Sequence, residues 1–550
     1  MPNISSEQII IHAERTSETE GGKIISGSRV SLILPSEPLR YLYSGWQSWS
    51  LTSWVDISRP VRPLRPISQR PRVADPDYVD ESRPNGSWYG AVEIDDGRVI
   101  FLGSLGLESH VLLEDRTLVG RYETGSGDWF FAIGDEIDIM TRYAELLGER
   151  FAATKNNSSF SPISVVGNIT SPIRVWCSWY SLYTLISEIN LLKILSDLDS
   201  TISGQSLPFD VFQIDDGWQV GIGNWEPNKK FPAGMEKMAS CIHASGRKAG
   251  LWLAPLLIVP SSSVYREHRD WLLHKENDDL VSAGFHWGEP LYALDTTHPG
   301  ALEWLTALME KIRTWGFEYA KLDFLYAGAL PGKRYVDTPR ETAFRNGLRT
   351  IREALGDTYL LTCGTPILPS LGLCDGIRIG PDVAGYYTSH IGDTLLRNFA
   401  FPGARNVIRT TLNRLWLKQL VHIDPDVVYF TSRQNSLSDE QISLLQHLAQ
   451  ICNFKATSDI PSWLTEVERQ SLCEFLETTP EIHRVGRTAF QIGNHLVDYE
   501  LNMGMPALPD SFTNTLGEII SRLADIPFVL MLFEYISKLT AQKKLKQNPV

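Results

Sequence analysis

Strand-like and helix-like segments alternate through residues 166–457, and repeated βα units over this length predict a (β/α)8 barrel. No GxGxxG or GxxxxGK[ST] motif follows any of the strand-like runs, which weakens the alternative of a doubly wound nucleotide-binding sheet. Residues 1–165 hold short strand-like runs separated by Gly, Pro, Ser and Asp, and they predict an N-terminal β-sandwich domain. Residues 458–550 predict a small C-terminal domain of β hairpins with a helical tail. The predicted fold class is α/β with an all-β flanking domain.

Within the predicted barrel, seven strand-like runs follow one another, most of them separated by a segment with helical periodicity. Leu302, Leu305 and Met309 illustrate that periodicity, because they fall on one helical face. After residue 458, the run 488–502 predicts a hairpin. The expected strands lie within 173–180, 209–216, 247–255, 317–324, 358–364, 376–382 and 416–430, and the expected helices span 187–200, 235–246, 300–316, 341–356, 393–412 and 439–453.

The charge balance and the cysteine pattern exclude several functional classes. The chain has 51 Lys and Arg against 65 Asp and Glu, a formal charge of −14, which argues against nucleic acid or an anionic membrane as the main partner. Six cysteines are scattered without a CxxC pair, which predicts a reduced, cytoplasmic protein without disulfides. Residues 1–18 lack a basic start followed by a long apolar run, so we expect no secretory signal.

The run YAKLDFLYAG (319–328) raises the first question about function, since two charged residues interrupt an otherwise apolar strand. Lys321 and Asp323 are two positions apart, so both side chains point to one face of the strand. Burying them there is costly unless they pair or take part in chemistry. Active sites of such barrels lie at the C-terminal ends of the strands. The other predicted strand ends carry Trp179, Asp215, Asp216, Trp252, Cys363, Arg378, Asp382, Asp424 and Asp426.

This set of residue types indicates a sugar site. Carboxylates supply acid, base and nucleophile, while the faces of tryptophan rings pack against the C–H face of a pyranose. Histidine is nearly absent from the strand ends, which disfavours a metal-dependent hydrolase, so no metal site is expected. From pattern alone, each carboxylate also fits a helix cap, and Trp179 and Trp252 also fit core positions.

Several longer motifs resemble one known family. The chain resembles the α-galactosidases of glycoside hydrolase family 36 (melibiases), particularly their short bacterial and archaeal type, over roughly residues 40–430. The motifs that carry the resemblance are GWQSWS (45–50), IDDGW (214–218), NWEPNKKFPAGM (224–235), GLWLAP (250–255), YALD (292–295), KLDFLYAGALPG (321–332), CGTPILPSLG (363–372), DGIRIGPDVA (375–384) and DPD (424–426).

The resemblance implies a role for each strand-end residue. Asp323 would be the catalytic nucleophile and Asp382 the general acid/base. Asp215 and Asp216 would accept hydrogen bonds from the galactose 4- and 6-hydroxyls. Lys321 is expected to hold Asp323 and lower its pKa. Further implied sugar-binding residues are Lys321, Arg378, Trp179, the stacking Trp252, Cys363 near the 2-hydroxyl, and an aromatic over the site mouth that is either Trp46 or Trp49.

The expected function is that of a retaining exo-α-galactosidase that cleaves galactose-containing oligosaccharides without metal or organic cofactor. Three alternatives stay open: an α-galactosyltransferase like the raffinose and stachyose synthases, an α-N-acetylgalactosaminidase, and a non-catalytic sugar-binding homologue. Relatives range from monomers to tetramers, which leaves a homo-oligomer open. The sequence departs from the family at LKQLVHI (417–423), where relatives carry W-x-N before DPD, and in its short C-terminal part.

Overall fold

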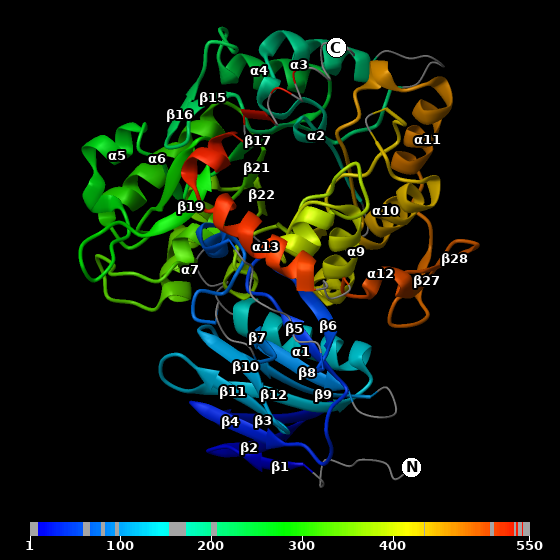
Figure 1. Ribbon diagram of the computed structural model, residues 1–550. Helices are drawn as coiled ribbons and strands as arrows, with labels where there is room; N and C mark the ends of the chain where they lie inside the picture. The colour runs from blue at the N-terminus through cyan, green and yellow to red at the C-terminus, as the bar shows by residue number, and fades with distance from the viewer. Residues whose placement is uncertain are drawn as a thin grey trace.

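The computed structural model describes residues 9–58, 66–78, 83–93, 98–152, 172–199, 206–433, 435–506 and 511–532, together with 535, 536, 539 and 542. Figure 1 shows an N-terminal sheet domain on one side and a ring of strands surrounded by helices on the other. The expected boundary between these two domains at 165/166 lies outside the described residues.

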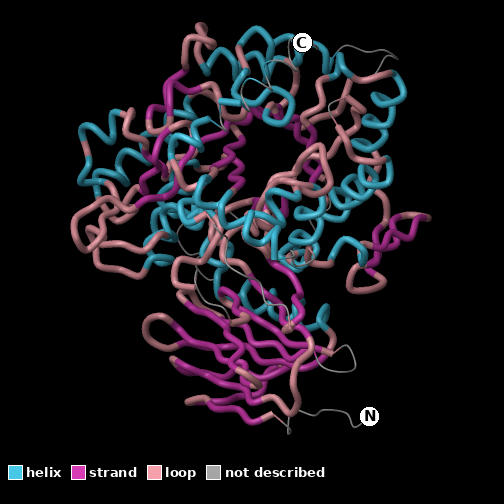
Figure 2. The backbone as a smooth tube through the Cα atoms, viewed as in Figure 1, coloured by secondary structure: helices cyan, strands magenta, loops and turns pink. Residues whose placement is uncertain are grey.

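Eight parallel strands form the ring, which confirms the predicted barrel (Figure 2). Their order is β24-β23-β22-β21-β17-β14-β13-β25, and a parallel bridge between Val427 and Ala456 nearly closes the ring. The strands are β13 (Ile173–Cys177), β14 (Val211–Ile214), β17 (Lys248–Leu253), β21 (Tyr319–Leu322), β22 (Tyr359–Thr362), β23 (Gly376–Arg378), β24 (His422–Asp424) and β25 (Phe454–Thr457).

The eighth strand, β25, is the one that the sequence pattern did not reveal. Its four residues include Lys455, which breaks the apolar run. In the structure the Lys455 ammonium is buried and donates to the carbonyls of Phe475 and Thr478, at 2.6 and 2.5 Å. A lysine whose charge is satisfied in this way can occupy a core strand.

In the described part of the chain, six longer helices surround the barrel. One departs from expectation: the helix predicted over 393–412 is split into a short π-helical turn (His390–Leu395) and α9, with Pro402 and Gly403 between them. Proline cannot continue a helix, and Gly403 has a positive φ of 155°. The six are α3 (Glu188–Asp199), α4 (Met235–Ala244), α6 (Pro299–Thr314), α7 (Arg340–Leu355), α9 (Ala404–Asn413) and α10 (Asp439–Cys452).

An insertion after β17 adds a small three-stranded sheet beside the barrel. Its strands are β18 (Leu257–Ile258), β19 (Ser282–His286) and β20 (Glu289–Ala293). Trp287 and Gly288 form the two-residue turn between β19 and β20, both with positive φ (54° and 79°). A turn of this kind fixes the hairpin register and aims the side chain of Trp287.

The N-terminal domain is β-rich, as predicted, and its twelve described strands are hydrogen-bonded into one continuous sheet. Strands from both halves of this sheet share one apolar core that includes Ile25, Val30, Ile100 and Trp129. Helix α1 (Glu136–Ala152) follows the last strand. The strands are β1 (Ile10–His12), β2 (Arg15–Thr19), β3 (Gly22–Gly27), β4 (Arg29–Ile33), β5 (Arg40–Ser44), β6 (Thr52–Asp56), β7 (Asn85–Ser87), β8 (Tyr89–Glu93), β9 (Val99–Ser104), β10 (Ser109–Glu114), β11 (Thr117–Tyr122) and β12 (Gly127–Gly134).

The C-terminal region follows the barrel with helix α11 (Glu466–Glu477). It then forms an antiparallel sheet of β26 (Ile482–Arg484), β27 (Ala489–Ile492) and β28 (His495–Asp498), which contains the predicted hairpin. Helix α13 (Ser511–Ala524) follows. Among the described residues, no helix combines the length and the apolar character that a membrane crossing requires.

Candidate active site

Lys321 and Asp323 do not pair with each other through the Lys321 ammonium, contrary to the expectation from sequence. The Nζ of Lys321 lies 3.0 Å from Oδ2 of Asp215, which follows β14, two strands away from β21 in the ring. Both side chains are at least nine-tenths buried, so each charge compensates the other. Lys321 therefore ties the sugar-binding candidate Asp215 to the strand that carries Asp323.

Asp323 lies directly after β21 and is buried among fixed donors. The indole N–H of Trp252 donates to Oδ2 at 3.0 Å, and the backbone N–H of Phe324 donates to Oδ1 at 2.8 Å. Burial raises the pKa of Asp323, and the charge of Lys321 and the bond from Trp252 oppose that rise without reversing it. The expected lowering of this pKa is therefore wrong, because desolvation outweighs the nearby cation.

Asp216 is held by two side chains that the sequence reasoning did not assign. Gln219 Nε2 donates to Oδ1 at 2.6 Å, and Trp287 Nε1 donates to Oδ2 at 2.8 Å. Its neighbour Asp215 accepts a bond from Gln213 Nε2 at 2.6 Å. Burial raises the pKa of Asp216. Gly288 was the sequence signal for this turn, because glycine readily adopts a positive φ.

The strands β23 and β24 bring Arg378, Asp382 and Asp426 together on another side of the ring. Arg378 Nη2 lies 3.2 Å from Oδ1 of Asp382 and also bonds to Oδ2 of Asp426. Arg378 is 2% exposed, whereas Asp382 is 43% exposed. Tyr180, which the sequence reasoning did not single out, donates to Asp426 as well. The exposed carboxyl of Asp382 can thus meet both a leaving group and water.

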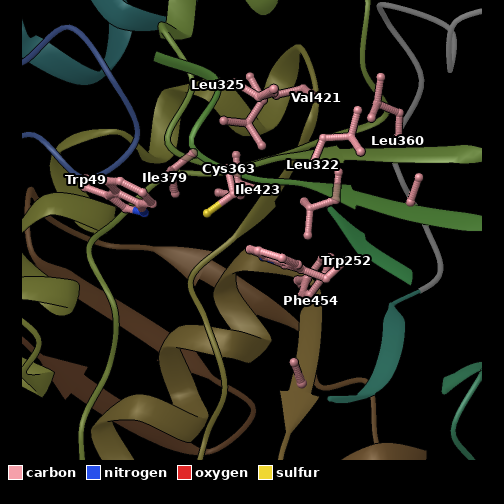
Figure 3. Packing of buried hydrophobic residues seen from close by; sticks show 14 of the residues in the cluster. Trp49, Trp252, Leu322, Leu325, Leu360, Cys363, Ile379, Val421, Ile423 and Phe454 are labelled. Atoms are coloured by element: carbon pink, nitrogen blue, oxygen red, sulfur yellow. The ribbon is translucent and has the colours of Figure 1, made fainter. Parts of the chain in front are cut away.

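Aromatic side chains connect these groups. The ring of Trp287 lies 6.2 Å from that of Trp252 and 5.1 Å from that of Phe324, centroid to centroid. In Figure 3 the rings of Trp49 and Trp252 flank Cys363, whose sulfur points toward the space between them. Trp179 packs edge-on against Tyr183 at 5.3 Å.

One buried arginine of the barrel holds the GWQSWS loop (45–50) of the N-terminal domain. Arg414, after α9, donates to the carbonyls of Gly45, Gln47, Ser48 and Ser50 at 2.6–3.0 Å. A guanidinium with several fixed acceptors holds such a loop rigidly. The loop is therefore anchored to the barrel.

Within this loop the structure separates the two tryptophan candidates. The ring of Trp49 lies 5.1 Å from that of Phe324, next to Asp323. Trp46 is fully buried, with the guanidinium of Arg340 5.2 Å above its ring. Trp49 is therefore the better candidate for the aromatic at the site.

One acidic cluster outside the strand ends has the geometry of a cation site. Asp75, Asp77 and His110 can bring their ligand atoms within 4.8 Å of one another. Arg340 Nη2 already lies 2.9 Å from Asp75 and 2.8 Å from Asp77. Burial alone would lower the pKa of His110, but the charge of Asp75 raises it to about 9. The positive charge that these carboxylates need comes from the protein itself.

Comparisons with known proteins show what this chain is similar to. A family model described as Melibiase matches residues 170–354. TtGalA, an α-galactosidase from Thermus thermophilus solved with p-nitrophenyl α-D-galactopyranoside, is 42% identical, with a TM-score of 0.83 over 90% of this chain and 97% of that chain. The chain belongs to glycoside hydrolase family 36.

Other members of family 36 are more distant. The structure of AgaA from Geobacillus stearothermophilus is 16% identical, with a TM-score of 0.53 over 85% of this chain and 65% of that chain, and supports the fold. α-Galactosidase Mel36A of Lactobacillus acidophilus is 29% identical over 140 residues, 24% of this chain. The matched segment spans only 17% of the length of that relative.

Proposed function

We propose that this protein is a retaining exo-α-galactosidase that removes terminal α-D-galactosyl residues from oligosaccharides. The observation that carries the proposal is the pair of strand-end carboxyls in opposite surroundings, Asp323 buried among donors and Asp382 exposed beside Arg378. Structures of TtGalA with p-nitrophenyl α-D-galactopyranoside and with stachyose support this substrate class.

In the first step, Asp323 attacks the anomeric carbon while Asp382 gives its proton to the glycosidic oxygen. The carbon–oxygen bond to the leaving group breaks as the bond to Asp323 forms, and a galactosyl-enzyme remains. Trp252 and the Phe324 N–H hold the carboxylate of Asp323 in one orientation. Burial destabilises its negative charge, which is relieved when the charge is shared with the sugar in the transition state.

In the second step, water enters beside the exposed Asp382, which has lost its proton and now acts as base. Asp382 takes a proton from the water, the water oxygen bonds to the anomeric carbon, and Asp323 leaves as a carboxylate. Two inversions restore the α configuration.

Specificity for galactose follows from the two aspartates directly after β14. Asp215 and Asp216 accept hydrogen bonds from the axial 4-hydroxyl and the 6-hydroxyl of galactose, while the ring of Trp252 packs on the sugar. A glucoside leaves a buried acceptor unpaired, which costs about 1–3 kcal/mol.

The test compares p-nitrophenyl α- and β-glycosides of galactose, glucose, N-acetylgalactosamine and xylose, with NMR of the first sugar released. We expect α-galactoside selectivity and α-galactose as the first product. Release of β-galactose would contradict retention, and a preference for another glycoside would contradict the role of Asp215 and Asp216. With stachyose, transfer to sugar acceptors in place of hydrolysis would identify a transferase.

A further inference from the structure

Asp426 follows β24 in a strained but tightly held conformation. Its φ is +88°, a value that residues other than glycine rarely adopt. Its backbone N–H donates to Oδ1 of Asp424 at 2.8 Å, and its own Oδ1 accepts from the N–H of Val427 at 2.7 Å. Backbone strain of this kind is costly and concentrates at functional sites, which points to a role for this carboxyl.

The second oxygen of Asp426 joins the parts of the site around the candidate acid/base. Its Oδ2 accepts from the backbone N–H of Val383 at 2.7 Å, and from Arg378 Nη2 and the Tyr180 hydroxyl. Val383 directly follows Asp382. Asp426 therefore fixes the chain that carries Asp382 and the guanidinium that lies beside it.

That guanidinium creates an electrostatic conflict. Arg378 Nη2 is 3.2 Å from Oδ1 of Asp382, and a cation at this distance favours the ionised carboxyl. A general acid must hold its proton until the leaving oxygen takes it. Asp426 bonds to the same nitrogen and is 3% exposed, and a buried countercharge acts strongly on its neighbours.

We propose that Asp426 is a positioning residue for Asp382: it holds Val383 in place and offsets the charge of Arg378, so that Asp382 keeps its proton at the pH of catalysis. This inference rests on the proposed function. The four groups that bond to the carboxyl oxygens of Asp426 are all donors, which matches the acceptor-only carboxylate. Burial raises the pKa of Asp426, and the charge of Arg378 opposes that rise.

Other ionisable groups face Asp382 from every neighbouring element. Burial raises the pKa of each of the tyrosines among them and of Cys363, so these groups stay neutral across the range tested. Charge near Asp382 then comes from Arg378, Asp426, Asp424 and Asp323, since Lys321 is paired with Asp215. The neutral groups are Tyr180 and Tyr183 after β13, Cys363 after β22, Tyr386 after β23 and Tyr429 after β24.

The test is the pH dependence of kcat/KM for the full chain and its Asp426→Asn variant, with stachyose and with p-nitrophenyl α-galactoside. The alkaline limb is the fall of kcat/KM at high pH. We expect this limb to lie about one pH unit lower in the variant, because the positive charge of Arg378 is no longer offset by Asp426. At a pH on that limb, stachyose hydrolysis should fall about tenfold, which is the same shift expressed as a rate. The activated aryl substrate should lose much less, since its leaving group needs little protonation.

Asp459→Asn is the matched control. Asp459 is another buried carboxyl, after β25, but it accepts from the backbone N–H groups of Phe430 and Thr431, at 2.6 and 3.1 Å. Its Asn variant should show the same pH profile of kcat/KM as the wild type. Tyr180→Phe removes one hydrogen bond to Asp426 without removing charge, and its alkaline limb should also stay in place.

An Asp426→Asn protein that folds, keeps both limbs and loses equally on both substrates would overturn the inference. If that variant does not fold, Arg378→Gln decides, because removing the cation should move the alkaline limb to higher pH, and an unmoved limb refutes the inference. A wild-type enzyme without an alkaline limb that depends on Asp382, or without α-galactosidase activity, refutes the proposed function instead.

Discussion

The two candidate catalytic carboxyls occupy contrasting regions of one barrel mouth. Asp323 is buried and accepts from two donors fixed by the fold, Trp252 Nε1 and the Phe324 N–H. Asp382 is 43% exposed and has the guanidinium of Arg378 beside it. A nucleophile needs a fixed direction of attack, whereas an acid/base must reach a leaving group and then water. Burial on one side and exposure on the other match these two tasks.

The contrast continues behind each carboxyl. On the nucleophile side, the ion pair between Lys321 and Asp215 crosses from β21 to β14. On the acid/base side, Arg378 lies between the carboxyls of Asp382 and Asp426. In the proposed mechanism, one cation supports sugar recognition and the other acts on Asp382, a division that substitutions can test.

Replacing the nucleophile should have the largest effect. We expect Asp323→Ala to lose on the order of 10⁴- to 10⁶-fold in kcat, because no covalent intermediate can form. Azide, which fits the space left by the carboxylate, should restore part of the activity and give β-galactosyl azide, identified by NMR. Near-normal turnover without azide would contradict the assignment.

Replacing the acid/base should have a smaller effect that depends on the substrate. Asp382→Ala should lose about 10²- to 10⁴-fold on stachyose and much less on 2,4-dinitrophenyl α-galactoside, which leaves without a proton. The measurement is kcat/KM for both substrates. Equal losses on both would argue that the exposed carboxyl does not transfer protons.

Changing the recognition pair should affect binding of one hydroxyl. Asp216→Asn should cost about 1–3 kcal/mol, a five- to 150-fold loss in kcat/KM on α-galactosides. The loss should shrink on a substrate that lacks the hydroxyl concerned, as measured with 4-deoxy and 6-deoxy galactosides. Asp210→Asn, just before β14 and paired with Arg174, is the control and should leave kcat/KM unchanged. Identical losses on all substrates would contradict direct recognition.

Replacing Trp287, in the turn between β19 and β20, should have a modest effect. Trp287→Phe keeps an aromatic ring but removes the bond from Nε1 to Asp216, worth about 1 kcal/mol. We expect KM for p-nitrophenyl α-galactoside to change about fivefold with kcat nearly constant. A large fall in kcat with constant KM would instead place Trp287 in the chemical step.

The carboxyl of Glu341 is buried outside the candidate site, so it shows what burial does to a carboxyl that takes no part in catalysis. Glu108 accepts from the N–H groups of Glu341 and Thr342 at the start of α7, and Glu341 accepts from the Glu108 N–H at 2.7 Å. Burial raises the pKa of Glu341 from 4.5 to about 7. The folded protein therefore binds this proton more tightly than the unfolded chain does.

Because the folded protein binds this proton more tightly, its free energy of unfolding should fall as pH rises from about 4.5 to about 7. Glu341→Gln is neutral at every pH, so its melting temperature should vary less over this range than that of the wild type, by a few degrees. Activity at a fixed temperature should change least of all the variants. Parallel melting profiles for the two proteins would contradict the raised pKa.

The barrel, the β-rich N-terminal domain and the strand-end residues were predictable, because periodicity and alternation report which face of an element is buried. The strand holding Lys455 was not, since only tertiary structure shows three carbonyls around its ammonium. The partner of Lys321 was also missed. Proximity in sequence favoured Asp323, whereas the register of β14 on β17 and of β17 on β21 brought Asp215 within reach. The contact between Trp287 and Asp216 was missed as well, because it depends on the direction of a hairpin turn, which no local sequence pattern specifies.

The most direct test of the division between the two carboxyls is to trap the intermediate. A fluorinated α-galactosyl fluoride, which forms the galactosyl-enzyme quickly and loses it slowly, should label the protein once, and peptide mass spectrometry should locate the sugar. We expect the label on Asp323, with Asp382 unmodified. A label on Asp382, or on Asp215 or Asp426, would contradict it.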